Sequence, residues 1–200
     1  NEVKLRLRQE GVDVIDLGMG NPDQPAATHI IDKLKEVVAD PKTHRYSASK
    51  GIPALLKSIC RFYGKRFDVH LDWEHEVIAT IGTKEGLSHL ALALLDPGDL
   101  ALVPNPIYPI HIYSVAMAGG NVVSFPLSEE EKLIPELEQI IRESWPKPKM
   151  MTLNFPHNPT SATVSLDFFK EIVRFAKKKE LVVIHDLAYA DIVFDGYEAP

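Results

Sequence analysis

The feature that most constrains the fold is the run Leu181–Ile184, four apolar residues of which three are β-branched. It follows a lysine-rich, helix-like segment and precedes polar residues, a pattern typical of a strand buried on both faces of a parallel sheet. Asp186 comes where this strand should end. Ligands of open α/β sheets bind outside the carboxyl ends of strands. We therefore expect the Asp186 carboxylate to be partly shielded from water and to need a cationic partner.

Tyr189 follows Asp186 by three residues, close enough for both side chains to reach one ligand. A carboxylate and a phenol together suit an aromatic ligand with a ring nitrogen and a phenolic oxygen, and pyridoxal 5′-phosphate has both. Asp186 would keep the pyridine nitrogen protonated, so that electrons released at a substrate α-carbon enter the ring. The alternative is that Asp186 only caps the next helix.

Composition narrows the class of protein. The chain has 200 residues, 45% of them hydrophobic and 25% charged, which is typical of a globular domain with a sizeable core. A net charge of −6 argues against a nucleic-acid or anionic-membrane partner. No apolar run reaches the roughly 18 residues of a membrane span, and no metal site is predicted. We expect a cytoplasmic protein.

Two further expectations concern the single cysteine and the chain ends. Cys60 shares the apolar stripe of a predicted helix, which indicates a core thiol. The chain opens inside an amphipathic helical pattern and stops in a loop-like segment. We therefore expect a fragment of a longer protein.

Helical and strand patterns alternate along most of the chain, which predicts an α/β sheet with right-handed crossovers. Helices are expected at residues 1–9, 28–39 with Thr28 as cap, 53–67, 87–95, 110–118, 133–144 and 166–178. Strands are expected at residues 14–17, 76–81, 100–103, 121–125, 149–154 and 181–184.

A candidate phosphate site lies between the expected strand 76–81 and the following helix. Gly82, Thr83 and Lys84 place backbone N–H groups at the positive end of a helix, where an anion binds well. The segment matches neither a dinucleotide nor an ATP motif, so other phosphate esters remain candidates. A plain strand–helix turn is the alternative.

Two more strand ends carry candidate ligand-binding side chains. Tyr108 is held between Pro106 and Pro109, so its ring could stack on a flat cofactor, although it could also be a packing tyrosine. Asn158 precedes Pro159, and its amide could donate to a phenolate oxygen, although it could also be a turn residue. Four strand ends that offer phosphate, ring-face, ring-oxygen and ring-nitrogen contacts favour one shared ligand.

The same segments, taken in order, resemble the fold-type I pyridoxal-phosphate aminotransferases of class I/II. The resemblance rests on residues 18–23, 46–53, 82–87, 104–109, 158–160 and 186–189 and covers essentially the whole chain. The chain looks most like the branch of bacterial alanine (glutamate–pyruvate) transaminases and LL-diaminopimelate aminotransferases. Such enzymes move an amino group from an amino acid to a 2-oxo acid.

The resemblance implies a three-layer α/β/α fold with a mixed, mostly parallel sheet, here incomplete. Residues 1–24 would belong to the small domain, and residues 25–200 would form the first part of the large domain. The implied roles are phosphate binding by Gly82, Thr83 and Lys84, ring stacking by Tyr108, contacts to the ring oxygen by Asn158 and Tyr189, and pairing of Asp186 with the ring nitrogen. Asp186 and Tyr189 would be the catalytic residues.

Two more residues acquire roles through the resemblance. Gly20 would lie against the substrate carboxylate, and Tyr46 would reach the phosphate held by a neighbouring subunit, which implies a homodimer. The lysine that forms a Schiff base with the cofactor and the arginine that grips the substrate carboxylate lie, in the family, beyond the segment matched by Asp186 and Tyr189. The chain ends before them.

The resemblance leaves departures and alternatives. Ser161 and Ala162 follow Asn158-Pro159-Thr160, where the family usually has glycine. The first half of such a chain would look alike in a C–S β-lyase that uses the same cofactor. A non-catalytic module that keeps the fold as a ligand sensor is the third alternative.

Overall fold

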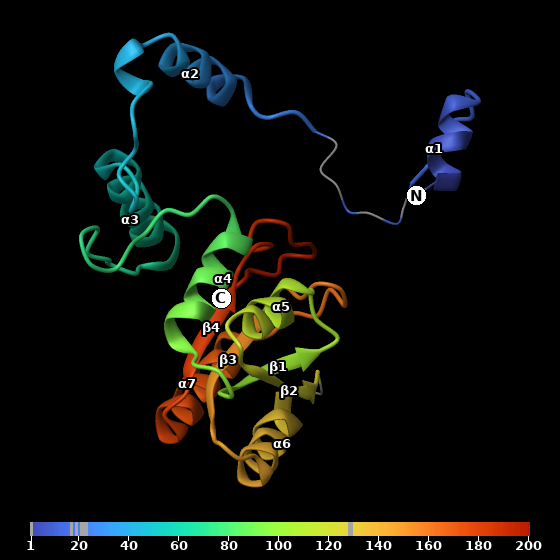
Figure 1. The fold of residues 1–200 in the computed structure, drawn as a ribbon, viewed down its shortest axis with the longest axis vertical. Helices are drawn as coiled ribbons and strands as arrows, with labels where there is room; N and C mark the ends of the chain where they lie inside the picture. The colour runs from blue at the N-terminus through green and yellow to red at the C-terminus, as the bar shows by residue number, and fades with distance from the viewer. Residues whose placement is uncertain (1, 17, 19, 21–23, 128–129) are drawn as a thin grey trace. The chain divides into compact units, whose positions relative to one another are not determined.

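The computed structural model describes residues 2–16, 18, 20, 24–127 and 130–200, which form two compact units, residues 1–47 and 48–200. The first unit contains α1 (Glu2–Gln9), α2 (Thr28–Val38) and the 3₁₀ turn η1 (Pro41–Thr43). The second contains all strands (Figure 1). Each unit is described by itself.

The second unit is an α/β domain. Its elements are α3 (Pro53–Phe67), α4 (Thr83–Leu94), β1 (Leu100–Asn105), α5 (Ile110–Met117), β2 (Asn121–Pro126), α6 (Glu130–Glu143), β3 (Pro148–Asn154), α7 (Leu166–Lys179) and β4 (Val182–Asp186). The strands form one parallel sheet in the order β2-β1-β3-β4. The predicted α/β class is confirmed, and all pairings among the described strands are parallel.

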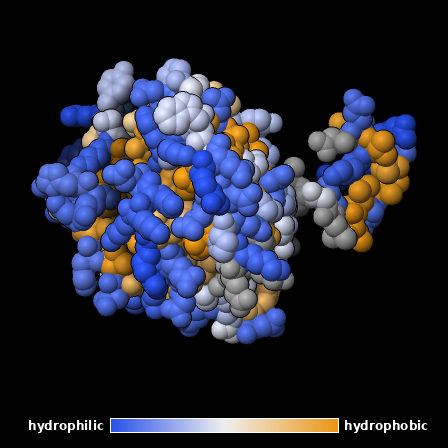
Figure 2. All heavy atoms as spheres, turned by 90° about the horizontal axis from the view of Figure 1, so that it is seen from below, coloured by the Kyte–Doolittle hydropathy of each residue, from blue (hydrophilic) through white to orange (hydrophobic). Residues whose placement is uncertain are grey.

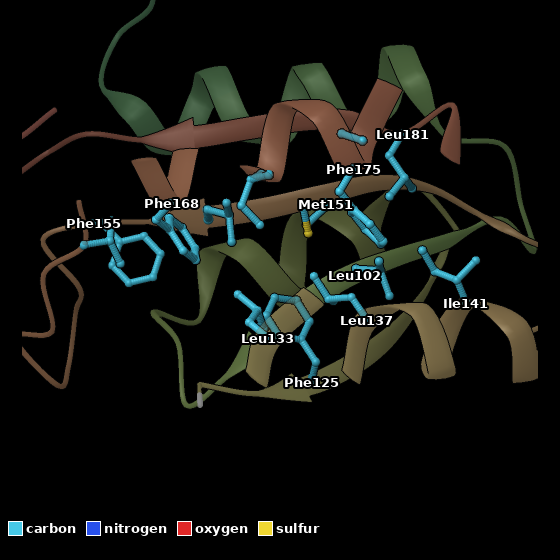
Figure 3. Packing of buried hydrophobic residues seen from close by; sticks show 14 residues of the cluster. Leu102, Phe125, Leu133, Leu137, Ile141, Met151, Phe155, Phe168, Phe175 and Leu181 are labelled. Carbon is cyan, nitrogen blue, oxygen red and sulfur yellow. The ribbon is translucent and has the colours of Figure 1, made fainter. Parts of the chain in front are cut away.

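Helices cover both faces of this sheet, so the domain has three layers. Side chains alternate along a strand with a period of two, which sends neighbouring residues to opposite faces. Ala101 and Met150 pack with α4 and α5, whereas Leu102 and Met151 pack with α6 and α7. Figure 3 shows the larger cluster on the α6–α7 side.

The edge strand β4 is less buried than we predicted. We expected a strand buried on both faces at residues 181–184, but β4 begins at Val182, whose side chain is 44% exposed. In the described chain, β4 has β3 as its only strand neighbour, so packing covers it less than the central strands β1 and β3. Cys60 is likewise half-buried rather than a core thiol.

Two predicted strands are absent from the described residues. Residues 76–81 are irregular, because a strand needs a row of hydrogen bonds to a neighbour and Ala79 donates only one, to the Lys50 carbonyl. Residues 14–16 are also irregular, and Leu17 lies outside the described residues. There the Asp16 carboxylate accepts from Lys4 Nζ at 2.7 Å.

Helix α2 corrects two expectations. Ala27, not Thr28, occupies its N-cap and makes no side-chain cap. None of its residues is buried, although we expected an apolar side facing a core. An apolar stripe becomes buried only against a partner, and the element that α2 packs against in its own unit is the short turn η1.

One face of the molecule is mostly polar. Figure 2 shows hydrophilic side chains over most of the visible face, broken by small hydrophobic patches. In the part of the chain that the structure describes, no helix is long and apolar enough to cross a membrane.

Helix α7 gives a stability prediction. Ser165 Oγ accepts a hydrogen bond from the Phe168 N–H at 3.0 Å and so caps the helix that carries Ile172 into the core. We expect Ser165→Ala to lower the free energy of unfolding of the full-length protein by about 1 kcal/mol, because the first turn loses its acceptor. Urea unfolding measures this. Ser165→Asp keeps an acceptor and should stay near wild type; equal losses in both variants would contradict the capping role.

Candidate active site

The candidate site lies at the carboxyl edge of the sheet, where β1, β3 and β4 end. The strand register pairs Asn154, the last residue of β3, with Asp186, the last residue of β4. The Asn154 Nδ2 donates to the Asp186 carbonyl at 2.8 Å. The edge is therefore held by a side chain as well as by the strand ladder.

Asp186 carries a buried carboxylate. The residue is 9% exposed, and its Oδ2 lies 3.0 Å from Nε2 of His111, which is 1% exposed. Because an ionised carboxylate only accepts hydrogen bonds, the His111 ring must carry its proton on Nε2. Asp186 belongs to a strand end and makes no helix cap, which contradicts the capping alternative.

His111 is the residue that sequence reasoning missed. It lies in the first turn of α5, one helical turn after Tyr108, and the two rings meet edge to face with centroids 6.3 Å apart. The available signal was a single histidine in the otherwise apolar helix start Ile110–Ile112, close to a strand end. A histidine that faces the core needs a buried hydrogen-bond partner, because burying an unpaired polar group is costly.

Asn158 and Tyr189 are brought together. The Asn158 Nδ2 donates to the Tyr189 hydroxyl at 3.1 Å, and the Asn158 N–H donates to Asn154 Oδ1 at 2.9 Å. The tyrosine hydroxyl accepts in this contact and keeps its own proton to donate. The pair can therefore present an O–H and a second amide N–H to one oxygen atom.

The predicted phosphate segment forms the start of α4. Gly82 is the N-cap with φ +82°, a conformation that favours glycine, and Thr83 and Lys84 are the first helical residues. A Cβ built on Gly82 would meet no atom within 4 Å, so the space beside this backbone is open. Glu85 accepts from the Ile81 N–H and thereby fixes the chain as it enters the helix.

Lys84 and Tyr108 connect the helix start with the β1 loop. The Lys84 ammonium lies 5.5 Å from the centroid of the half-buried Tyr108 ring. Tyr108 in turn touches His111, the partner of Asp186. A series of contacts thus links Lys84 to the Tyr108 ring, this ring to His111, and His111 to the buried Asp186 carboxylate.

The remaining predicted residues, Gly20 and Tyr46, belong to the first unit. Both are exposed, and the Tyr46 side chain is fully so. Of the loop 18–23, residues 19 and 21–23 lie outside the described part of the chain. The roles given to Gly20 and Tyr46 stay predictions.

Two other histidines lie at the same edge. His157 is 3% exposed, and burial lowers its pKa, as does the nearby charge of His111. His185 Nε2 lies 3.0 Å from the Phe155 carbonyl, and burial lowers the pKa of this ring too. Burial therefore favours the neutral form of both rings.

The family described as Aminotransferase class I and II matches residues 12–199. The glutamate-pyruvate aminotransferase AlaC of Escherichia coli is 55% identical over 199 residues, covering 100% of this chain and 48% of AlaC. The LL-diaminopimelate aminotransferase of Moorella thermoacetica is 42% identical, covering 96% of this chain and 50% of that protein. The chain spans about half the length of the curated relatives it matches.

Solved structures of aminotransferases and of BacF are similar to this chain. Apo-BacF from Bacillus subtilis superposes with a TM-score of 0.90 at 38% identity, covering 100% of this chain and 51% of that one. A Thermus thermophilus aspartate aminotransferase mutant gives 0.87 at 29% identity, covering 100% and 52%. The fold, the family match and the relatives confirm the resemblance seen in the sequence. The chain belongs to the class I and II aminotransferase family.

Proposed function

We propose that the protein containing this chain is a pyridoxal-phosphate-dependent aminotransferase that transfers an amino group from alanine, glutamate or a related amino acid to a 2-oxo acid such as 2-oxoglutarate or pyruvate. The observation that carries the proposal is the buried Asp186 carboxylate held by His111 at a strand end of this family's fold. A buried carboxylate suits a cationic ring nitrogen, which supplies the charge that compensates its burial.

The residues present fit pyridoxal phosphate. The open backbone at Gly82 and the helix start at Thr83 and Lys84 suit the phosphate, because N–H groups and the helix dipole favour an anion there. Tyr108 offers a ring for stacking. When bound, the cofactor withdraws electrons from the substrate α-carbon.

The chain's own residues then have separable tasks. Asp186 would accept a hydrogen bond from the protonated ring nitrogen, and His111 holds this carboxylate in place. Asn158 and Tyr189 would donate hydrogen bonds to the ring oxygen. The hydrogen bond between these two side chains holds both of them in position for this contact. By family resemblance, Gly20 would lie against the substrate carboxylate. All of these residues bind or orient the cofactor or the substrate. Such binding removes translational and rotational freedom of the reactants before the reaction.

The substrate proposal rests on the relatives. AlaC, whose name gives glutamate and pyruvate, is more similar to this chain than the LL-diaminopimelate aminotransferases compared with it. The test is a coupled assay of the full-length protein with alanine and 2-oxoglutarate, beside LL-diaminopimelate and 2-oxoglutarate. Release of ammonia and pyruvate from a sulfur amino acid without a 2-oxo acid would instead identify a β-lyase, and absence of any turnover would favour a non-catalytic module.

The architecture of the whole protein is also proposed by family resemblance. Residues 1–24 would join the small domain, residues 25–200 would begin the large domain, and the protein would be cytoplasmic. The single half-buried cysteine is compatible with a reducing compartment.

We expect the active protein to be a homodimer. Tyr46 is fully exposed in its own unit, and the family role of this residue is to serve the phosphate site of the partner subunit. Sedimentation of the full-length protein at assay concentrations should therefore show a dimer. A fully active monomer under those conditions would contradict this expectation.

We expect Tyr108→Ala in the full-length protein to weaken pyridoxal phosphate binding by about two- to twelve-fold beyond the loss of buried area, the effect of roughly 0.5–1.5 kcal/mol for a stacked aromatic pair. Equilibrium dialysis of the cofactor measures this. Tyr113→Ala removes an exposed tyrosine from α5, the helix that follows Tyr108, and is the matched control. Equal affinities of both variants would rule out stacking.

A further inference from the structure

Asn154 is a buried amide at the end of β3 that makes two hydrogen bonds with its side chain. The residue is 1% exposed, and the buried residues Leu153 and Phe155 flank it in the chain. Its Nδ2 donates to the Asp186 carbonyl at 2.8 Å, and its Oδ1 accepts from the Asn158 N–H at 2.9 Å. Because burying an amide without partners is costly, these two bonds determine how the side chain lies.

The two partners determine which end of the amide faces which residue. A backbone carbonyl can only accept a hydrogen bond, and a backbone N–H can only donate one. The amide nitrogen must therefore face Asp186, and the amide oxygen must face Asn158. Rotating the amide by half a turn would place two acceptors together at one end and two donors together at the other, so a single arrangement satisfies both partners.

These bonds connect the strand ends that carry the candidate site. The ladder between β3 and β4 ends with the pair Asn154 and Asp186. From this pair the Asn154 side chain makes one bond across to β4 and one bond forward to the loop after β3. Within that loop, Asn158 Nδ2 donates to the Tyr189 hydroxyl at 3.1 Å. The two strand ends and the residues after them thus form a closed ring of chain segments and hydrogen bonds.

We propose that Asn154 is a positioning residue that holds Asp186, assigned to the ring nitrogen, at a fixed distance from Asn158, assigned to the ring oxygen. The inference deepens the proposed function and rests on it for the identity of the ligand. A planar aromatic ring carries its nitrogen and its oxygen at a fixed separation, so both contacts form together only when the two chain segments are held at the matching distance. Asn154 acts through the backbone of its two partners.

The test uses the full-length protein freed of cofactor and two probes. Pyridoxamine 5′-phosphate has the ring nitrogen, the ring oxygen and the phosphate but no aldehyde, so it binds without a covalent link to a lysine. Inorganic phosphate tests only the start of α4, where Gly82 and Thr83 lie. Calorimetric titration gives the dissociation constant of each probe.

We expect Asn154→Leu to weaken binding of pyridoxamine 5′-phosphate by about ten-fold, the scale of one or two lost hydrogen bonds, and binding of inorganic phosphate by less than about two-fold. Asn154→Ala should have the same effects, and it replaces the leucine variant if that variant does not fold. Unchanged affinity for pyridoxamine 5′-phosphate, or equal weakening of both probes, in a folded Asn154 variant would overturn the proposal.

Asn121→Leu is the matched control. Asn121 is exposed at the start of β2, at the amino edge of the parallel sheet and so at the other end of the strands from the candidate site. This variant should bind both probes like the wild type. A loss of pyridoxamine 5′-phosphate binding as large as that in Asn154→Leu would show that the effect is not specific to Asn154, and it would overturn the proposal.

Hydrogen exchange tests the hydrogen bond without any ligand. The Asn158 N–H should exchange about ten-fold faster in Asn154→Leu than in the wild type, because its acceptor is lost. Asn154→Asp keeps an oxygen acceptor of the same reach, so exchange should stay within about two-fold of the wild type. Equal exchange rates in all three proteins would contradict the role of Asn154.

These measurements do not depend on turnover. If the full-length protein failed to transaminate while both probes and the exchange rates behaved as expected, the proposed function would fail and the role of Asn154 would stand. If the protein transaminated while Asn154→Leu bound pyridoxamine 5′-phosphate like the wild type, the inference would fail and the aminotransferase would stand. A wild type that bound no pyridoxamine 5′-phosphate would overturn both.

Discussion

Asp186→Ala in the full-length protein is expected to lower transamination by about a thousand-fold or more, the scale of losing a preorganised charge in a buried site. Without the carboxylate, nothing at this strand end keeps the ring nitrogen protonated, so the cofactor is a weaker electron acceptor. Phosphate binding should stay largely intact, because Gly82, Thr83 and Lys84 belong to the start of α4, whereas Asp186 ends β4.

Two controls sharpen this experiment. Asp186→Asn keeps the shape and a hydrogen-bonding side chain but removes the charge, so it should be nearly as inactive as alanine. Asp191→Ala removes an exposed carboxylate five residues later, which has only a 3.9 Å contact with Arg66, and should retain wild-type activity. Turnover near wild type in Asp186→Ala, measured at saturating cofactor, would show that the role assigned to Asp186 is wrong.

Borohydride reduction of the full-length holoenzyme is expected to attach the pyridoxyl group to no lysine within residues 1–200. The Schiff-base lysine of the family lies beyond the matched segments, and Lys84 is the only lysine among the residues assigned to cofactor binding. Its ammonium lies 5.5 Å from the Tyr108 ring centroid at the start of α4, a position suited to the phosphate.

Peptide mass mapping after reduction measures this directly, with an unreduced sample as the control. The isolated 200-residue chain should correspondingly lack transaminase activity and bind the cofactor without a covalent link. Stoichiometric labelling of one lysine within residues 1–200 would refute the assignment of the family's catalytic layout to this chain.

Local sequence determined most of the element order. Pro53–Phe67 forms a helix with the predicted bounds, and the helices and strands from α4 onward lie within a few residues of their predicted positions. The reason is that periodicity, proline at a first turn and a serine cap act within a few residues of chain. The same local signals located Gly82, Tyr108, Asn158 and Asp186 at the ends of elements.

Local signals failed where structure depends on a partner. The apolar runs at residues 14–17 and 76–81 have strand composition, but a strand exists only when another strand accepts its hydrogen bonds. The exposed apolar face of α2 and the half-exposed Val182 have the same origin. Sequence pattern states which face a residue prefers, and only a neighbour can bury it.

The candidate site also has features that local sequence determines and features that depend on distant residues. The sequence by itself placed a carboxylate, a phenol and an amide at or soon after strand ends, because these residues adjoin the runs that form the strands. The helix start at Thr83 was also predicted, but residues 76–81 before it form no strand in the described structure. Only the tertiary structure decided that Asp186 pairs with His111, 75 positions away, and that the loop after β3 is tied to Asn154 at the same edge. Parallel crossover connections bring these residues together, and no local pattern encodes which distant residues become neighbours.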